Sequence, residues 1–452
     1  MSAPFCSANP PDLAQLTRNR ALIFIALQPF NTTLVNDPRA KALLAYAGFR
    51  SFDVLNFQHT SGAFHYPHAL LSAGNANLNV VASLTEVSPV WRRNLPGTTF
   101  LDSGGFSVAT GALSVQEYFQ RRHQLWAWQA AFGTQLDNVI FAGMDVPTAA
   151  FRRGIRGIGS YQNCLLRTES NIRDQVQERI PGRYRLLNVI QGMTAGTGPH
   201  SLVHWYRHIK HLNDVHRWGE RACEGWALGG LWWLEPEDLL LLLWHMYHDR
   251  MLSGRNNWLH IFGVTEARMV AIFSLIQRAL RYQLQEPNFT ISCDSSNPTK
   301  NMGKGGSRYV GTGNVVATER LPDRPLKSDG IHRFPLQFVD DHEGDAFPYT
   351  TAVPFSGFAP WQILATADLL KGTVLEGTPL HSALILQGDN PNGGLNPLGQ
   401  MVMAFANTEA FLRQTYATAD RYIAAHERNL VPAIVATLSS ATPPLTPPIA
   451  FP

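Results

Sequence analysis

Residues 100–107 combine three residue types that could hold a flat ligand and move a proton on it. An apolar run ends at Asp102, whose carboxylate could serve as a general acid or base. Gly104 and Gly105 follow, and glycine lets a backbone approach a ligand closely because it has no side chain. The ring of Phe106 offers an apolar face to a planar group. The segment therefore predicts a site that binds a planar molecule and transfers a proton.

Five more segments that could do chemistry follow short apolar runs further along the chain. In chain order they are MDVP at 144–147, VIQG at 189–192, ALGGL at 227–231, HIFGV at 260–264 and CDSSNPTK at 293–300. Each has a plain structural explanation when it is taken alone. An Asp after a strand is often a helix N-cap, and a lone Phe is more often packed in the core. Their joint occurrence, however, predicts one composite site.

The spacing of these segments indicates alternating strands and helices. The run ends fall at 102, 145, 191, 230, 263 and 294, with helix-like stretches between them at 114–131, 159–178, 199–213, 236–251 and 266–283. Repeated βα units build a parallel sheet, and one or two earlier runs, at 21–27 and 79–82, bring the total close to eight. We therefore predict an α/β protein, a (β/α)8 TIM barrel whose active site lies at the carboxyl ends of the strands. A doubly wound open sheet is the alternative, but it would concentrate its glycines in one early loop.

The sequence changes character after about residue 300, which predicts three parts. Residues 1–310 are expected to form the catalytic core of the barrel, with insertions. Residues 311–438 are expected to complete the barrel and to add a helical or irregular extension, including one long helix at 400–429. Residues 439–452 are rich in proline and are expected to form a disordered or extended tail.

Composition narrows the class of protein without naming its function. The charged fraction of 16% and net charge of +3 permit a nucleic-acid partner but do not require one, because local clustering of cations decides such binding. The four cysteines form no C-x-x-C pair, so the sequence predicts a reducing, cytoplasmic setting without a disulfide framework. The first residues do not resemble a signal peptide, and the longest apolar run, 239–246, is too short to span a bilayer.

The six segments in this order resemble the guanine transglycosylases, the queuine and archaeosine tRNA-ribosyltransferase-like enzymes that exchange guanine in nucleic acid for a 7-deazaguanine. The resemblance covers about residues 95–310. It implies a TIM barrel and a covalent glycosyl-enzyme intermediate. Asp294 matches the family nucleophile, and Asp102 matches the acid/base that assists guanine departure and then takes a proton from the incoming base. The alternative role for Asp294 is an N-cap in the turn that follows it.

The resemblance also implies a set of base-binding residues. Asp145 would accept hydrogen bonds from the amino and ring N–H groups of the purine, and Gln191 would donate to its carbonyl. Phe106 and Phe262 would sandwich the base, at positions where family members often carry Tyr and Met. The expected base-binding set is Ser103, Gly104, Phe106, Asp145, Gln191, Gly229, Gly230 and Phe262. The alternatives are a turn acid for Asp145, a loop-capping amide for Gln191 and core packing for the two rings.

Cations near the expected nucleophile could bind the nucleic-acid backbone. Lys300, Lys304 and Arg308 lie in a glycine-rich run after Asp294, where exposed backbone N–H groups and positive charge suit phosphates. Arg152 begins a second basic run, at 152–156. The alternative for both runs is a solvated charged loop.

The chain departs from the tRNA-acting members at their zinc site. Those members carry C-x-C-x-x-C and a His after the nucleophile, whereas no cysteine follows Cys293 here. We therefore expect no cofactor; zinc is possible but not indicated. The resemblance is closer to the DNA-acting 7-deazaguanine transglycosylases of phages and bacteria. The expected partners are DNA and a base such as preQ0, in a bacterial or phage-infected cytoplasm. The alternatives are a zinc-less tRNA enzyme, a non-catalytic partner subunit and an unrelated barrel hydrolase.

Overall fold

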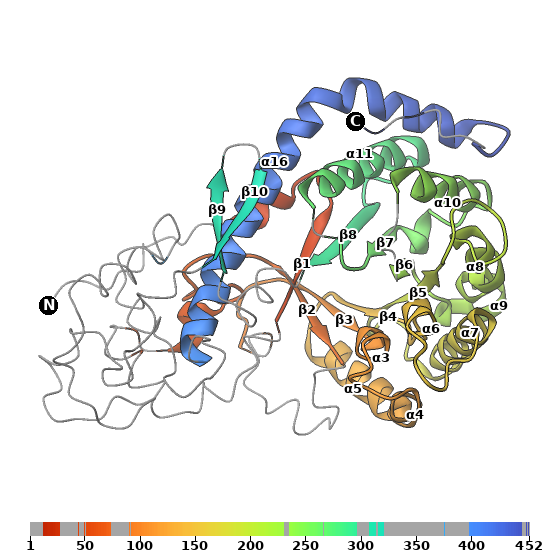
Figure 1. Cartoon of the computed structure of the whole chain (residues 1–452), viewed down its shortest axis with the longest axis horizontal. Coiled ribbons are helices and arrows are strands. Elements are labelled where there is room, and N and C mark those ends of the chain that lie inside the picture. Colours follow the sequence, from red (N-terminus) through yellow and green to blue (C-terminus); the bar gives the residue numbers. More distant parts are fainter. Residues whose placement is uncertain are drawn as a thin grey trace, which may run out of the picture.

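The computed structural model describes residues 12–27, 44, 49, 51–73, 90, 92–229, 235–264, 266–295, 307–312, 315–320, 375, 397–444, 449 and 451. Eight parallel strands close into a barrel in chain order, with β8 paired to β1 (Figure 1). They are β1 (Leu22–Ala26), β2 (His68–Ser72), β3 (Thr98–Asp102), β4 (Val139–Ala142), β5 (Arg185–Gln191), β6 (Trp226–Gly229), β7 (Trp258–Ile261) and β8 (Thr290–Ser295). Helices surround the barrel, so the predicted (β/α)8 architecture is confirmed.

Serine caps begin several of the helices between the strands. Ser114 and Glu117 form a capping box at α4, and Ser160 and Ser201 accept backbone N–H groups at α7 and α8. The α-helices are α3 (Gly105–Ala109), α4 (Val115–Gln120), α5 (Arg122–Gln135), α6 (Thr148–Arg152), α7 (Tyr161–Glu178), α8 (Leu202–Ile209), α9 (Val215–Trp218), α10 (Pro236–His248), α11 (Ala267–Leu284) and α16 (Pro397–Ser439). Short 3-10 turns are η1 (Leu13–Thr17), η4 (Phe52–Leu55), η5 (Lys210–Asn213), η6 (Gly219–Arg221) and η7 (Gly254–Asn256). The stretch expected as one helix at 114–131 is two, α4 and α5, which meet at Arg121.

The second strand of the barrel is not the one expected from the sequence. β2 spans His68–Ser72, and all five of its residues are buried. It pairs with β3 along its whole length, from His68 opposite Thr98 to Ser72 opposite Asp102. The run at 79–82 lies outside the described residues. All eight strands are complete by Ser295, so the described part of 311–438 contributes a helix to the barrel and no strand.

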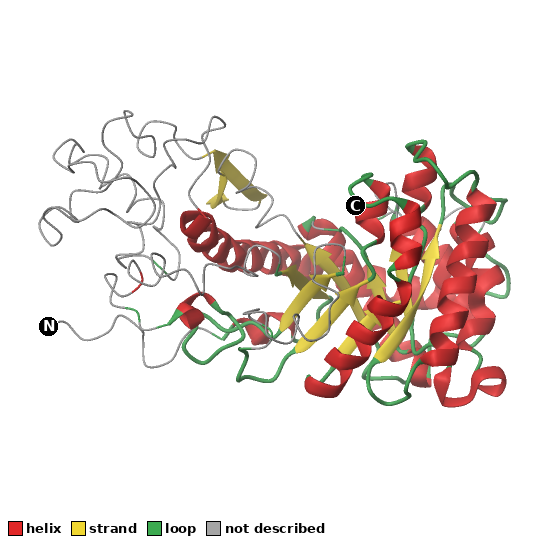
Figure 2. Ribbon diagram, turned by 90° about the horizontal axis from the view of Figure 1, so that it is seen from below, coloured by secondary structure: helices red, strands yellow, loops and turns green. Residues whose placement is uncertain are grey.

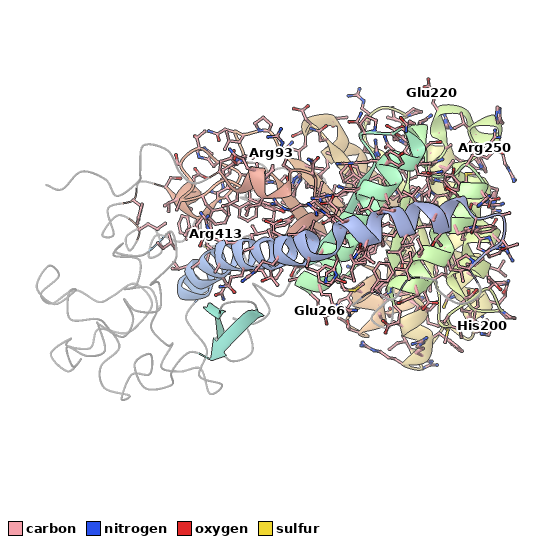
Figure 3. The ribbon with its side chains drawn as sticks, turned by 90° about the horizontal axis from the view of Figure 1, so that it is seen from above. Arg93, His200, Glu220, Arg250, Glu266 and Arg413 are labelled. Carbon is pink, nitrogen blue, oxygen red and sulfur yellow. The ribbon has the colours of Figure 1, made fainter. Side chains whose placement is uncertain are left out.

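The long helix α16, near the C-terminus, contacts residues near the N-terminus. It packs along α11, and one part of it extends away from the barrel beside the hairpin of β9 (Ser307–Thr312) and β10 (Val315–Arg320) (Figures 1 and 2). The hydroxyl of Tyr416 accepts from the backbone N–H of Ile23 at 3.2 Å, and Asp420 pairs with Arg20 at 2.6 Å. Figure 3 labels Arg413 on the extending part. Among the described residues, no helix combines the length and apolar character needed to cross a membrane.

Aromatic rings fill the barrel interior. Phe24, Phe100 and His260 are buried and come from β1, β3 and β7, yet their ring centroids lie 3.9 to 5.9 Å apart. Side chains alternate along a strand, so Asp102 and Phe262, two residues after Phe100 and His260, point to the same side and lie nearer the carboxyl-end mouth of the barrel. The ring layer is therefore the floor beneath the expected site.

Candidate functional site

The sequence-predicted acids and amide gather at the carboxyl ends of the strands. Asp102 and Gln191 end β3 and β5, Asp294 lies near the end of β8, and Asp145 follows β4. The strands are parallel and the barrel is closed, so these ends meet at one mouth. The structure thus brings together side chains that are up to 192 positions apart in the chain.

Asp102 is held in a state from which it can exchange a proton near neutral pH. Burial, and to a smaller degree the charge of Asp294, raises its pKa to about 6. The hydroxyl of Ser72 donates to Asp102 Oδ2 at 2.9 Å, and this bond and the N–H groups of Ser103 and Gly104 oppose the rise in pKa. A carboxyl group with a pKa close to the working pH can serve as acid in one step and base in the next.

Asp294 is fixed through one of its two oxygens. The backbone N–H of Gly263 donates to Oδ1 at 2.7 Å, and Nε2 of His260 lies 3.5 Å from the same oxygen. The side chain is 16% exposed. His260, 3.5 Å from Asp294 Oδ1, stacks at 3.9 Å on Phe100, which stands two residues before Asp102 on β3, so the two acids lie at the same mouth of the barrel. Such a pair can act as nucleophile and acid/base in glycosyl transfer.

Asp145 and Gln191 form a buried polar network. The hydroxyl of Ser103 donates to Asp145 Oδ1 at 2.9 Å, and Nε2 of Gln191 donates to Asp145 Oδ2. The hydroxyl of Tyr118 donates to Ser103 at 3.0 Å, and the backbone N–H of Thr148 donates to Gln191 Oε1 at 2.6 Å. Burial, followed by the charge of Asp102, raises the pKa of Asp145 to about 7. The network therefore orients a carboxyl and an amide toward the same space.

The glycines after Asp102 let the backbone reach this network. Gly104 adopts a φ of +87° as the N-cap of α3, a conformation that favours glycine. A Cβ on Gly105 would lie 2.8 Å from Asp145 Oδ1, so only glycine fits there without a shift. Phe106 follows with 62% of its surface exposed, which a core residue would not have. Its exposure agrees with the expected stacking role.

Phe262 and Gly229 lie at the other edges of the site. Phe262 is half-buried, with its ring edge-on to Phe100 at 5.7 Å and to His260 at 4.6 Å. A Cβ on Gly229 would lie 3.5 Å from the side chain of Gln191, so its backbone runs beside the amide. Gly230 lies outside the described residues.

The expected backbone-binding cations are only partly described. Arg152 is exposed at the end of α6, and its guanidinium donates to the carbonyl of Met193. Arg308 lies in β9, which runs beside α16 and outside the barrel (Figure 1). Lys300 and Lys304 lie outside the described residues. The structure therefore does not bring these cations together into one described surface, and their role stays a prediction.

Several residues of the site were not among those expected. Ser72 lies on β2, which the sequence pattern does not reveal. Tyr118 and Thr148 carry no local signal, because they reach the site only through tertiary contacts. His260 stands in the HIFGV segment, and its position two residues before Phe262 could have indicated an inward-facing side chain.

Neither possible metal ligands nor sequence comparisons narrow the function of the site further. Cys164, Cys223 and Cys293 are buried free thiols. Within the part of the chain that the structure describes, no three His, Cys, Asp or Glu side chains are arranged to hold a metal ion. No protein-family model and no curated protein sequence matches this chain.

Proposed function

We propose that this protein is a guanine transglycosylase, a pentosyltransferase that exchanges guanine in DNA for a 7-deazaguanine such as preQ0. One observation carries the proposal: Asp294, held through Oδ1 by the Gly263 N–H, and Asp102, whose pKa burial raises to about 6, lie at the same mouth of the closed barrel. A fixed carboxylate beside a carboxyl that titrates near neutrality is the pair that retaining glycosyl transfer requires.

In the first step Asp294 attacks the sugar of the target nucleotide. A lone pair of a carboxylate oxygen forms a bond to C1′, and the electrons of the C1′–N9 bond leave with guanine. Asp102, in its protonated form, gives its proton to the departing purine. A pKa of about 6 leaves a useful fraction of Asp102 protonated near neutral pH. The product is an ester between Asp294 and the sugar.

In the second step the 7-deazaguanine takes the place of guanine. Asp102, now a carboxylate, accepts the proton from N9 of the incoming base. N9 attacks C1′, and the electrons of the ester bond return to Asp294. Two displacements at one carbon retain the configuration of the glycosidic bond, so the product nucleotide keeps its β configuration.

The Asp145–Gln191 network supports recognition of the guanine edge. The amide nitrogen of Gln191 carries two hydrogens. One forms the hydrogen bond to Asp145, so the second can be donated to the purine carbonyl. The purine N–H donors stabilise the ionised form of Asp145 and so lower its raised pKa on binding. Phe106, a residue 62% exposed, supplies a stacking face.

The choice of DNA over tRNA is supported by the sequence after the nucleophile. No cysteine follows Cys293, so the zinc site that tRNA-acting members of the resembled family use is missing in its usual form. Reaction within a duplex would also require the target nucleotide to be turned out of the stack.

An exchange assay tests the proposal. Wild-type protein is incubated with labelled preQ0 and guanine-containing DNA in one reaction, and with labelled preQ0 and tRNA in another. Label is expected in DNA, and Asp294→Asn should abolish it, whereas Asp174→Asn, which alters an acid paired with Arg122 on the barrel exterior, should not. Label in tRNA alone would refute the DNA assignment, and base release without any incorporation would indicate a hydrolase instead.

A further inference from the structure

The side chain of His260 lies in the barrel interior directly beside the proposed nucleophile. Its Nε2 is 3.5 Å from Asp294 Oδ1, and its Nδ1 is 2.9 Å from the hydroxyl of Ser292. The imidazole is fully buried. Ser292 and Asp294 are two residues apart on β8, so both side chains point to the same face of the strand. The contact between Nδ1 and Ser292 is a hydrogen bond, whereas Nε2 is buried without a hydrogen-bond partner among the described residues and faces Asp294 Oδ1.

The hydrogens around His260 can be assigned from donor and acceptor chemistry. The indole N–H of Trp258 can only donate, and it lies 2.9 Å from the Ser292 hydroxyl oxygen, which must therefore accept. The hydroxyl has one hydrogen of its own, and Nδ1 of His260 is its described acceptor. We therefore assign the hydroxyl hydrogen to the bond with Nδ1, which is then assigned no hydrogen of its own. Burial lowers the pKa of His260, so the ring is neutral and its hydrogen is on Nε2, facing Asp294.

Packing keeps the imidazole in this orientation. The ring of Phe100 stacks on it, with centroids 3.9 Å apart and an interplanar angle of 25°, and Phe262 meets it edge-on at 4.6 Å. A ring flip would place a carbon beside Ser292 and would break the hydrogen bond between its hydroxyl and Nδ1. The opposite tautomer would point a nitrogen lone pair at the carboxylate and be repelled by it.

We propose that His260 is a positioning residue, held by Trp258 and Ser292 as the Nε2–H tautomer, and that it and the Gly263 N–H together bind Oδ1 of Asp294, which leaves Oδ2 to attack the sugar. This inference rests on the proposed function for the attack step. Oδ1 becomes the carbonyl oxygen of the ester in the covalent intermediate and still accepts both N–H groups. The same two donors therefore serve both steps, and no proton moves through His260.

The tautomer can be measured without any substrate. In protein labelled with ¹⁵N-histidine, correlation of each ring nitrogen with the ring protons distinguishes a nitrogen that carries hydrogen from one that does not. The signal of His260 is assigned as the one missing from His260→Gln. A neutral ring with hydrogen on Nε2 is expected at pH 7 to pH 8, and Ser292→Ala should keep this tautomer but shift the Nδ1 resonance, because Nδ1 loses its hydrogen bond with the hydroxyl. An imidazolium or an Nδ1–H ring in the wild type would overturn the proposal.

Kinetics tests the positioning role. His260→Leu removes the donor and should lower kcat for base exchange about 100-fold, the scale of a misplaced reacting group, with KM for DNA unchanged. His260→Gln returns an N–H near the Nε2 position and should recover at least about 10-fold of that loss. His68→Leu is the matched control, because His68 is also a buried histidine of the barrel interior, packed on Phe24 and Tyr66. It should keep wild-type kcat.

The outcomes separate the two proposals. Equal losses of kcat in His260→Leu and His68→Leu, or no recovery in His260→Gln, would assign His260 a packing role only. If His260→Leu does not fold, the ring spectra and the kcat of Ser292→Ala test the positioning role instead. The kcat of Ser292→Ala is expected to be about 10-fold below that of the wild type. If the wild type exchanges no base at all, the proposed function fails, while the tautomer measurement still tests the assignment of hydrogens.

Discussion

Ser72 and Asp102 stand opposite each other in the register of β2 and β3, and the Ser72 hydroxyl donates to Asp102 Oδ2 at 2.9 Å. The bond favours the charged carboxylate and opposes the rise in pKa that burial produces. Strand pairing thus sets the acidity of the proposed acid/base through a residue that touches neither sugar nor base in the proposed reaction.

Ser72→Ala should therefore raise the pKa of Asp102 further above about 6. Guanine release needs protonated Asp102, so kcat/KM for this step falls as pH rises through that pKa. A hydrogen bond to a charged group contributes about 1.5 kcal/mol, so the fall should move to higher pH by about one unit. The measurement is the pH profile of kcat/KM for guanine release. Ser72→Thr keeps the hydroxyl and should keep the wild-type profile; an unshifted profile in Ser72→Ala would contradict the assignment of Asp102.

The raised pKa of Asp145 predicts a pH-dependent stability. The folded protein favours the protonated form, because the pKa rises from 3.8 to about 7. The contribution of this group to stability is therefore fully present below about pH 4 and is lost as pH rises through about 7. Asp145→Asn removes the titration, so its stability should not fall between pH 4 and pH 8 as that of the wild type does.

The free energy of unfolding, measured in urea from pH 4 to pH 8, checks this expectation. The difference between wild type and Asp145→Asn should be smallest at pH 4 and should grow with pH. Parallel curves for the two proteins would show that Asp145 has an ordinary pKa in the folded state.

A side chain at Gly105 should push Asp145 aside, since its Cβ would lie 2.8 Å from Asp145 Oδ1. Gly105→Ala is expected to displace that carboxyl and to weaken binding of the 7-deazaguanine by about 10-fold or more, the cost of one or more displaced hydrogen bonds to a charged group. Gly198→Ala is the matched control, because nothing lies within 4 Å of its Cβ position. Base affinity measured by calorimetry compares the two. Equal affinities would place the base away from Asp145.

The sequence predicts the barrel and the acids of the site, because both follow from local pattern. Apolar runs that end in an acid, an amide or glycine recur at βα spacing, and in a closed barrel such ends must meet. The sequence does not reveal β2 because His68 and Ser72 at its ends shorten its apolar run to three residues. A longer strand with branched residues would have been visible.

The contacts that tune the site could not be predicted in the same way. The bonds from Ser72 to Asp102, from Gly263 to Asp294 and from Tyr118 to Ser103 depend on register and loop geometry, which no single segment encodes. The C-terminal helix was expected at 400–429 but spans Pro397–Ser439, with Pro432 inside it. Buried Leu430, Ile434 and Leu438 continue its apolar face past the proline, so packing outweighs the local preference to end there.

The central claim is that Asp294 forms a covalent bond with the sugar of the target nucleotide. Wild-type protein in excess over guanine-containing DNA, without an acceptor base, is quenched in denaturant, digested and mapped by mass spectrometry. We predict a sugar adduct on the peptide that carries Asp294, its discharge when preQ0 is added before the quench, and no adduct in Asp294→Asn. An adduct on another residue, or base exchange by Asp294→Asn at the wild-type rate, would contradict the claim.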